Sequence, residues 1–454
     1  MEKMRIGSGL GFYGDSWQPI RATIESGDVQ YVASDHLAEL TLAILQKDRL
    51  KDPSAGYTKD LVPMLSELYP LAKHRRVKFI LNAGGLNPLG AQAALAAAFS
   101  KQGWSARIAA VTGDSVLERV DELQQAGVTF AHLDSGASFS AVRARTLFAN
   151  AYLGAKPIVD ALRQGADIVI TGRVADAALF LAPMIHEFGW RFDDLNKLAQ
   201  GVLVGHLLEC SGQGSGGNYG GDWENVPDLA HIGYPIAEVT ENGDALITKV
   251  EGTGGRIDYD TVREQMLYET HNPRRYISPD VVVDMGTSVL RDLGHDRVSL
   301  TGTVGYPKPE SLKVLAGYED GYMADARVGY SWPDALAKAR SAAAIVQTQM
   351  QEAGIAVDES LVEYQGYDSL HGTLSDPEHA DQLNEVYLRI AIRTRDRGTA
   401  SRFGRIIPPL FLSGPPFVTM GGVNPPKTLL GIWPTLVARE RVEERVQVHM
   451  VTTP

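Results

Sequence analysis

The residues with the clearest chemical potential lie in one glycine-rich stretch near the middle of the chain. Residues 209–223 contain the single cysteine, Cys210, six glycines and several polar side chains. Each glycine loses more backbone freedom on folding than any other residue, so a dense run is retained mainly where the backbone turns tightly or approaches a ligand. We therefore expect one wall of a ligand site here, the alternative being a flexible surface connection. The expected contacts are Ser211, Gly212, Gln213, Gly216 and Gly217.

Ionisable side chains near the ends of predicted strands and helices supply candidate acids and bases. The candidate catalytic residues are Asp35, Glu39, Asp176, His206, Glu209 and Cys210. Carboxylate bases beside groups that stabilise an oxyanion suit proton abstraction next to a carbonyl, as in hydration, dehydration or retro-aldol cleavage. Two of these residues have structural alternatives. Asp35, with Ser34, can simply cap a helix that begins at residues 34–40, and a lone cysteine is more often a small buried apolar side chain.

A second group of residues favours binding of an anion. A predicted strand at 77–81 leads through a Gly-Gly turn into a helix at 89–102, an arrangement that aims backbone N–H groups at an anion. Arg173 is predicted in the first turn of a helix, where a cation opposes the helix dipole unless a carboxylate or phosphate lies nearby. An ion pair with Asp176 is the structural alternative. The predicted substrate-binding residues of this group are Asn82, Gly84, Gly85, Asn87, Asn150, Thr171 and Arg173.

No cofactor is predicted. The glycines at positions 7, 9, 11 and 14 do not match the spacing of a dinucleotide fingerprint, and residues 17–19 interrupt the helix that should follow. Neither an H-E-x-x-H nor a C-x-x-C pattern occurs, so no metal ligands are predicted. Asp35, His36 and Glu39 are nevertheless residue types that could bind a divalent metal. A hydrolase of the G-x-S-x-G type is also not indicated.

Composition narrows the class of protein. A chain of 454 residues is too long for one ordinary core, so two or three domains are expected. A net charge of −12 argues against nucleic acid as a partner, and one cysteine excludes an intrachain disulfide. The apolar runs are far shorter than the roughly 20 residues that span a bilayer, and the N-terminus shows no signal-peptide core. We expect a cytoplasmic protein without membrane contact.

Repeated strand–turn–helix units must position the candidate residues. Strands are predicted at 5–8, 29–33, 77–81, 105–111 and 166–170, each followed by a turn and a helix. Such repeats predict an α/β fold with a mostly parallel, Rossmann-like sheet and helices on both faces in the N-terminal half. A TIM barrel competes, but the regular units are too few.

The second half of the chain has a different pattern. Residues 241–244 form a hairpin turn between two short strands, and a long helix is predicted at 332–353. Further strands are predicted at 281–283, 298–302, 312–317, 387–394, 411–412 and 446–451. This mixture predicts an α+β C-terminal region. The expected domains are residues 1–230, carrying the glycine-rich turns, and residues 231–454, packing over the site.

Several motifs, taken together, resemble the acyclic terpene utilization (AtuA) family. The motifs are Asn82–Pro88, Ala149–Ala155, Thr171–Asp176 and Glu209–Gln213, supported by Ser34–Glu39, Leu267–Glu269 and Asn272-Pro273. The resemblance covers residues 1 to about 450. It implies a role in citronellol and geraniol breakdown, where intermediates are branched, carboxylated acyl-CoA esters. Many family members carry, or are encoded beside, a small ferredoxin-fold domain, which is not obvious here, and this leaves a separate small partner subunit open.

The residues and the resemblance lead to two expected functions. The first is a lyase of the hydro-lyase type that acts on a carboxylated or CoA-linked branched acyl substrate. The alternative is a non-catalytic binding or scaffold subunit whose site is completed by the small ferredoxin-fold partner. A homo-oligomer is expected for either, as for most proteins of this kind.

Overall fold

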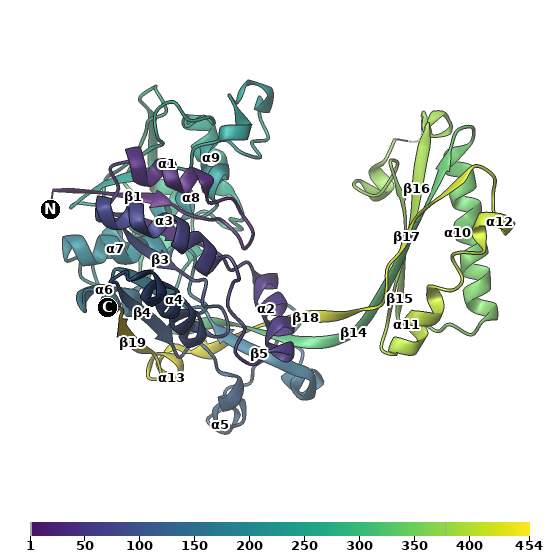
Figure 1. Ribbon diagram of the computed structural model, residues 1–454, viewed down its shortest axis with the longest axis horizontal. Helices are drawn as coiled ribbons and strands as arrows, with labels where there is room; N and C mark the ends of the chain where they lie inside the picture. Colours follow the sequence, from purple (N-terminus) through teal and green to yellow (C-terminus); the bar gives the residue numbers. More distant parts are fainter. Residues whose placement is uncertain (1, 377) are drawn as a thin grey trace. The chain divides into compact units, whose positions relative to one another are not determined.

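The computed structural model describes residues 2–376 and 378–454 and has a mixed α/β architecture (Figure 1). The chain forms two compact units. Unit 1 runs to Ala141 and also contains Leu147–Gly317 and Trp433–Pro454, whereas unit 2 consists of Val142–Thr146 and Tyr318–Ile432. The domain boundary expected at residue 230 therefore falls inside unit 1.

The centre of unit 1 is a block of five parallel strands in a larger sheet. In spatial order these are β1 (Lys3–Ser8), β2 (Tyr31–Ser34), β3 (Lys78–Leu81), β6 (Ile168–Thr171) and β4 (Arg107–Thr112). All four residues of both β2 and β6 are buried, as expected for parallel strands covered on both faces. The prediction of a mostly parallel N-terminal sheet is confirmed, and the described residues form no barrel.

Antiparallel strands extend this block on both sides to ten strands. Beyond β1 lie β7 (Ile236–Thr240), β8 (Ala245–Thr248), β12 (Val298–Thr301) and β11 (Val289–Asp292), and beyond β4 lies β19 (Gln447–Thr452). The predicted hairpin is confirmed: Val239 pairs with Ala245, and Gly243 turns the chain at φ 97°. Because strands after residue 230 hydrogen-bond to β1, they belong to the same sheet as the N-terminal strands.

Helices cover both faces of the sheet (Figure 1). On one face, α1 (Gln18–Ser26), α3 (Leu61–Arg75) and α4 (Pro88–Gln102) share an apolar core with strand residues such as Val32. The other face is covered by α6 (Lys156–Arg163), α7 (Ala178–Phe188) and α8 (Leu195–Leu208). Tyr31 precedes Val32 and so points to the opposite face, where its hydroxyl donates to Glu187 of α7. The helices predicted on both faces are confirmed.

The remaining elements of unit 1 are short or peripheral. They are α2 (Glu39–Lys51), α5 (Val120–Gln125), β5 (Thr146–Ala151), α9 (Tyr259–Leu267), a small sheet of β13 (Val304–Tyr306), β10 (Val282–Asp284) and β9 (Tyr276–Ile277), and α13 (Arg439–Glu443). β5 starts in unit 2 and continues into unit 1.

α2 begins at Glu39 with Ala38 before it, so the expected helix cap at Ser34 or Asp35 is wrong. Ser34 Oγ instead accepts from the N–H of Leu10 at 2.8 Å.

Unit 2 is an antiparallel sheet with helices on one face. Its strands follow the order β15 (Glu359–Gln365), β16 (Glu385–Thr394), β14 (Ser311–Ser331) and β17 (Val418–Val423), and β18 (Lys427–Ala438) also pairs with β14. β14 begins in unit 1, and β18 ends there. Alternate residues of β14, including Ala326 and Val328, enter a core with α10 (Ala335–Glu352) and α11 (Arg397–Phe403). The strand expected at 411–412 is wrong. Those residues form α12 (Leu410–Ser413), which follows Pro408-Pro409, residues that suit a helix start.

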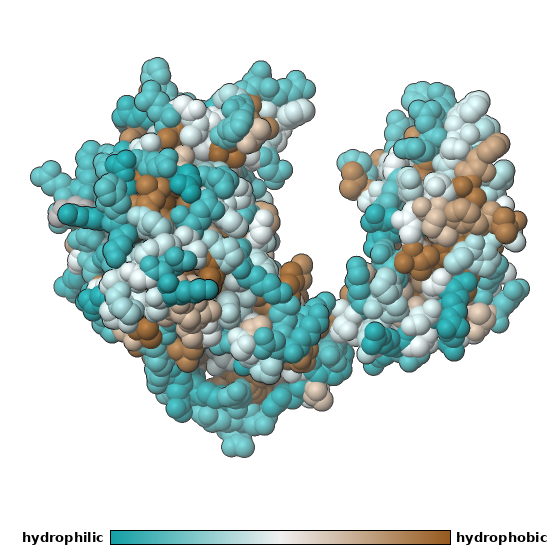
Figure 2. All heavy atoms as spheres, in the orientation of Figure 1, coloured by the Kyte–Doolittle hydropathy of each residue, from teal (hydrophilic) through white to brown (hydrophobic). Residues whose placement is uncertain are grey.

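Figure 2 shows apolar side chains in separate areas within a largely hydrophilic face of unit 1. Among the described residues, none of the helices combines the length and the apolar character that crossing a membrane requires.

Candidate active site

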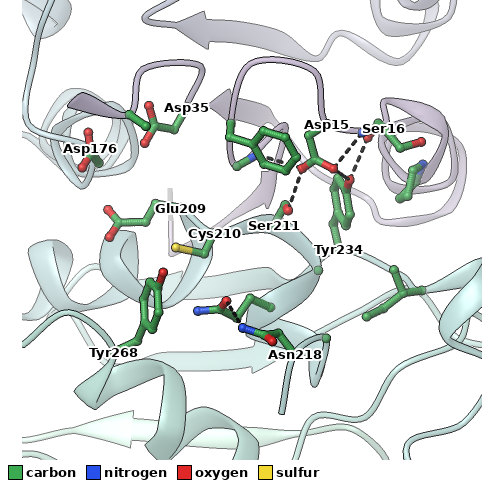
Figure 3. A pocket seen from close by; sticks show the side chains of 18 of the residues that line it. Asp15, Ser16, Asp35, Asp176, Glu209, Cys210, Ser211, Asn218, Tyr234 and Tyr268 are labelled. Carbon is green, nitrogen blue, oxygen red and sulfur yellow. Dashed lines mark hydrogen bonds between the residues drawn. The ribbon is translucent and has the colours of Figure 1, made fainter. Parts of the chain in front are cut away.

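The described part of unit 1 contains a pocket of about 1280 Å³ at the carboxyl ends of β1, β2 and β6. Ligands of open α/β sheets gather at this edge, because the loops that follow parallel strands all emerge there. The pocket walls come from the loops after these strands, the stretch after α8, the segment before β7 and residues just after α9 (Figure 3).

The glycine-rich stretch forms the floor of the pocket. After α8 ends at Leu208, the residues that line the floor are Glu209, Cys210, Ser211, Gly212, Gln213, Gly217 and Asn218. A side chain would clash with backbone at one of these glycines and would be tightly packed at another. A Cβ at Gly217 would lie 2.9 Å from the carbonyl oxygen of Gly212, and one at Gly212 would lie 3.2 Å from Ile232. Gly216 turns the chain at φ 86° without lining the pocket.

One end of the pocket is organised by Asp15, which the sequence analysis did not select. Its Oδ2 accepts from the N–H of Gly11 at 3.0 Å and from the hydroxyl of Ser211 at 2.7 Å. Its Oδ1 accepts from the N–H of Ser16 at 2.7 Å and from the hydroxyl of Tyr234 at 3.0 Å. These four donors join three separate segments of the chain. The only sequence signal for this role was an acidic residue at the end of the glycine turn after β1.

The other end gathers carboxyl groups that have few donors (Figure 3). Asp35 is buried and accepts from the N–H of Leu37 and from the side chain of Asn82. Burial, reinforced by the charge of Asp176, raises the pKa of Asp35 well above its ordinary range. Glu209 is only 6% exposed, and burial raises its pKa to about 7. Both carboxyl groups therefore hold protons more strongly than free carboxylic acids.

His206 lies behind Glu209 and does not line the pocket. Its Nδ1 is 2.9 Å from Oε1 of Glu209. Burial acts to lower the pKa of His206, but the hydrogen bond and charge of Glu209 raise it overall. The imidazole packs against the ring of Tyr276 with 5.3 Å between centroids, and the backbone oxygen of His206 accepts from Gln265. The His206–Glu209 pair is thus fixed by packing on the side away from the pocket.

Arg173 lines the same end, and both of its terminal nitrogens are occupied by protein groups, whereas its Nε has no hydrogen-bond partner. Its two terminal nitrogens donate to the carbonyl of Leu37 and to Asp176, and its guanidinium lies 4.2 Å above the ring of Tyr152. α7 begins at Ala178, so the expected placement of Arg173 in the first turn of a helix is wrong, and the structural alternative, the pair with Asp176, is present. Lys313 lies over the other side of this cluster, 4.9 Å from the centre of the Tyr152 ring.

The other residues expected to bind an anion do not reach the pocket. Asn82 donates to Asp35 and accepts from the N–H of His36, while the N–H groups of Gly84 and Gly85 donate to the carbonyls of Thr171 and Asn82. Asn87 caps α4 through the N–H of Gly90, and Asn150 donates to Asp114. These residues support the loops from behind. The expected clamp of Arg173, Asn82 and glycine amides is therefore not assembled.

Three residues of the pocket lining have strained backbone conformations, as do eight other non-glycine residues in the described part of the chain. Ser211, Asn218 and Glu269 have φ values of 48°, 57° and 55°. Residues other than glycine adopt this left-handed region rarely, and such strain persists where surrounding structure enforces it, often at functional sites. The three residues come from two different walls of the pocket.

The charged lining is dominated by carboxyl groups. Five of them lie among the residues of the Arg173 end and its neighbouring walls, namely Asp35, Glu39, Asp176, Glu209 and Glu269, against the cations Arg173 and Lys313. Glu39 and Lys313 form an ion pair at 2.7 Å.

Within residues 2–376 and 378–454, no cluster of three or more His, Cys, Asp or Glu side chains is arranged to hold a metal ion. Cys210 lines the pocket, and burial raises the pKa of its thiol.

Fold and site together define an α/β protein with a carboxyl-rich pocket at the carboxyl edge of a largely parallel sheet. Residues 4–448 match the family described as acyclic terpene utilisation family protein AtuA, and the chain belongs to this family. Membership ties the protein to acyclic terpene utilisation. No curated protein matches the sequence. No solved structure matches it either.

Proposed function

We propose that the protein is a lyase of the hydro-lyase type that acts on a branched acyl substrate, carboxylated or CoA-linked, in acyclic terpene utilisation. The observation that carries the proposal is the carboxyl group of Glu209. It lines the pocket, is held by His206 at 2.9 Å, and has a pKa raised by burial to about 7. A general base works best when its pKa lies near the working pH.

Dehydration requires one group that removes a proton and another that delivers one. The Glu209 carboxylate removes a proton from the carbon next to the acyl carbonyl, and the electrons of that C–H bond form the C=C bond. The C–O bond to the hydroxyl at the next carbon breaks, and the hydroxyl leaves as water with a proton from Asp35. Hydration is the reverse. The raised pKa of Asp35 suits it to the proton-donating role.

Two neighbours support these roles. His206 orients the Glu209 carboxyl group, because its Nδ1 faces Oε1 and its ring is packed against Tyr276. The imidazole stays beside this carboxyl group while the charge of Glu209 changes during the reaction. Lys313 is a cation that an acyl carbonyl or carboxylate can approach, since it lines the pocket and its side chain is 40% exposed. Arg173 instead balances the charge of Asp176.

The test follows the proton and the water separately. The purified chain is incubated with a branched 2-enoyl-CoA thioester in ¹⁸O-labelled water, and with the corresponding saturated thioester in D₂O, and both are analysed by mass spectrometry. We expect ¹⁸O addition in the first and deuterium exchange in the second, and Glu209→Gln should abolish both. Glu224→Gln, at an exposed position of the same stretch, is the matched control and should leave both unchanged.

Two results would argue against the proposal. Full exchange and hydration in Glu209→Gln would remove this residue from the reaction. Tight binding of the thioester with neither exchange nor hydration would favour the other expected function, a non-catalytic binding subunit that needs a small partner.

A further inference from the structure

Apolar side chains gather at the end of the pocket away from the carboxyl cluster, beside the polar residues Ser16, Gln18 and His231. The apolar side chains come from the loop after β1, the start of α1 and the segment before β7; they are Phe12, Pro19, Ala22, Leu229, Ala230 and Ile232. Phe12 is 53% exposed and Leu229 is 47% exposed, although both lie in the wall of a concave site. Large apolar side chains left open in a pocket are typical of a site that a ligand covers.

The floor connects the apolar end directly to the carboxyl end. Glu209 and Gly212 are only three residues apart in the floor, and Gly212 packs against Ile232, with 3.2 Å between its ideal Cβ position and that side chain. Gly11 packs on the backbone of Cys210 between them. Figure 3 shows the same order, with Glu209 near Asp35 and Asp176, and Ser211 near Asp15 and Tyr234. One ligand can therefore contact Glu209 with its head and Ile232 with its chain.

The size of the pocket favours an extended ligand. Its volume of about 1280 Å³ exceeds the roughly 300–1,000 Å³ of common small-molecule sites. A compact acid of a few carbons held at Glu209 would leave the apolar end exposed to water. An amphipathic molecule, with a polar head at the carboxyl groups and a hydrocarbon chain over Phe12 and Leu229, would cover both ends.

We propose that the apolar side chains within residues 12–22 and 229–232 form an acyl-chain subsite, and that this subsite selects long chains over short ones. The identity of the polar head rests on the proposed function. The preference for chain length does not, because binding can be measured without turnover. Each methylene that the subsite removes from water should tighten binding by about fourfold.

The first test compares ligands that differ only in chain length. Isothermal titration calorimetry on Glu209→Gln, which cannot turn ligands over by the proposed route, uses methyl-branched acids and alcohols of five and ten carbons as probes. We expect the ten-carbon probes to bind at least tenfold more tightly. Ala22→Trp, which fills the subsite, should remove this difference and leave the five-carbon probes unaffected. Glu25→Trp places the same bulk on an exposed position of α1 and should keep the difference.

A second pair of variants removes apolar surface without adding bulk. Leu229→Asn should weaken the ten-carbon probes about tenfold, whereas Leu267→Asn should have no effect, because Leu267 is equally exposed at 48% but lies outside the pocket. Equal affinity for both chain lengths, no binding of either, or equal behaviour of the two Leu variants would overturn the subsite. A ten-carbon preference in a chain that catalyses no exchange would retain the subsite and refute the proposed reaction.

Discussion

The two ends of the pocket use carboxyl groups in opposite ways. Asp15 accepts four hydrogen bonds from three segments of the chain, so each of its oxygens is fully used. Glu209 is buried more deeply than the partly buried Asp15, but only His206 faces one of its oxygens, and the other has no hydrogen-bond partner. The same chemical group therefore serves as a structural tie at one end and as a proton-exchanging group at the other.

The difference lies in the number of donors rather than in burial alone. Donors stabilise the charged form of a carboxyl group, whereas burial without donors stabilises the neutral form. Asp15 sits where backbone N–H groups of a glycine-rich turn and two hydroxyls converge. Glu209 follows the last turn of α8, where Cys210 and the apolar helix offer no comparable set. Local backbone geometry thus decides which acid holds the structure and which can take part in chemistry.

The largest effect that can sharpen this comparison is on turnover. Glu209→Gln keeps the shape of the side chain and removes its proton chemistry, so we expect hydration to fall by about 10²–10⁴-fold with little loss of thermal stability. Initial rates and the melting temperature measure the two effects. If the rates did not change, Glu209 would not be the proton-exchanging group. If stability also collapsed, Glu209 would have the structural role that is assigned here to Asp15.

The next largest effect is on stability at the opposite end. Asp15→Ala leaves the hydroxyl of Ser211 and two N–H groups without this acceptor, while the hydroxyl of Tyr234 keeps the carbonyl of Ser16. We expect the free energy of unfolding to fall by about 2–4 kcal/mol. Urea denaturation measures it, and Asp134→Ala, at an exposed position, is the control. A change in the free energy of unfolding below about 0.5 kcal/mol would show that Asp15 does not hold these segments together.

The pH dependence of stability should also separate the two ends. The pKa of Glu209 is raised to about 7 in the folded protein, above its ordinary value of about 4.5, so the folded state binds a proton that the unfolded state has lost. The stabilisation of the folded state by this protonated carboxyl group is therefore complete below pH 4.5, and it is lost as the pH rises to about 7. Relative to Glu209→Gln, the native protein should lose about 2–3 kcal/mol over this range in urea titrations. Parallel curves for the two proteins would contradict the assignment.

The smallest effect concerns the floor between the two ends. A methyl group at Gly217 would lie 2.9 Å from a backbone oxygen, which cannot move freely, whereas one at Gly220 would have its nearest neighbour at 3.5 Å. Gly217→Ala should therefore lower the free energy of unfolding by about 1–2 kcal/mol and weaken the ten-carbon probes, and Gly220→Ala should do neither. Equal behaviour would mean that the floor has no need for a glycine at 217.

Much of the fold was predictable from periodicity and turn chemistry. The buried strand at 168–171, the Gly243 hairpin and the helices on both sheet faces all follow from local patterns of apolar residues and glycine. The sequence also indicated that residues 209–217 form a wall beside the strand ends. The helix at 410–413 was missed because two apolar residues are too few to distinguish a strand from a helical turn.

The sequence by itself therefore determined the α/β class, the family and the edge of the sheet where polar residues collect, because these depend on patterns within about ten residues. Only the tertiary structure decided which polar groups share partners. It assigned Asn82 and the Gly84 and Gly85 amides to support of the loops, paired Arg173 with Asp176, and placed His206 behind Glu209. Hydrogen-bond partners far apart in the chain leave no local pattern, so the roles of Asp15 and Glu209 emerge only once the segments have packed together.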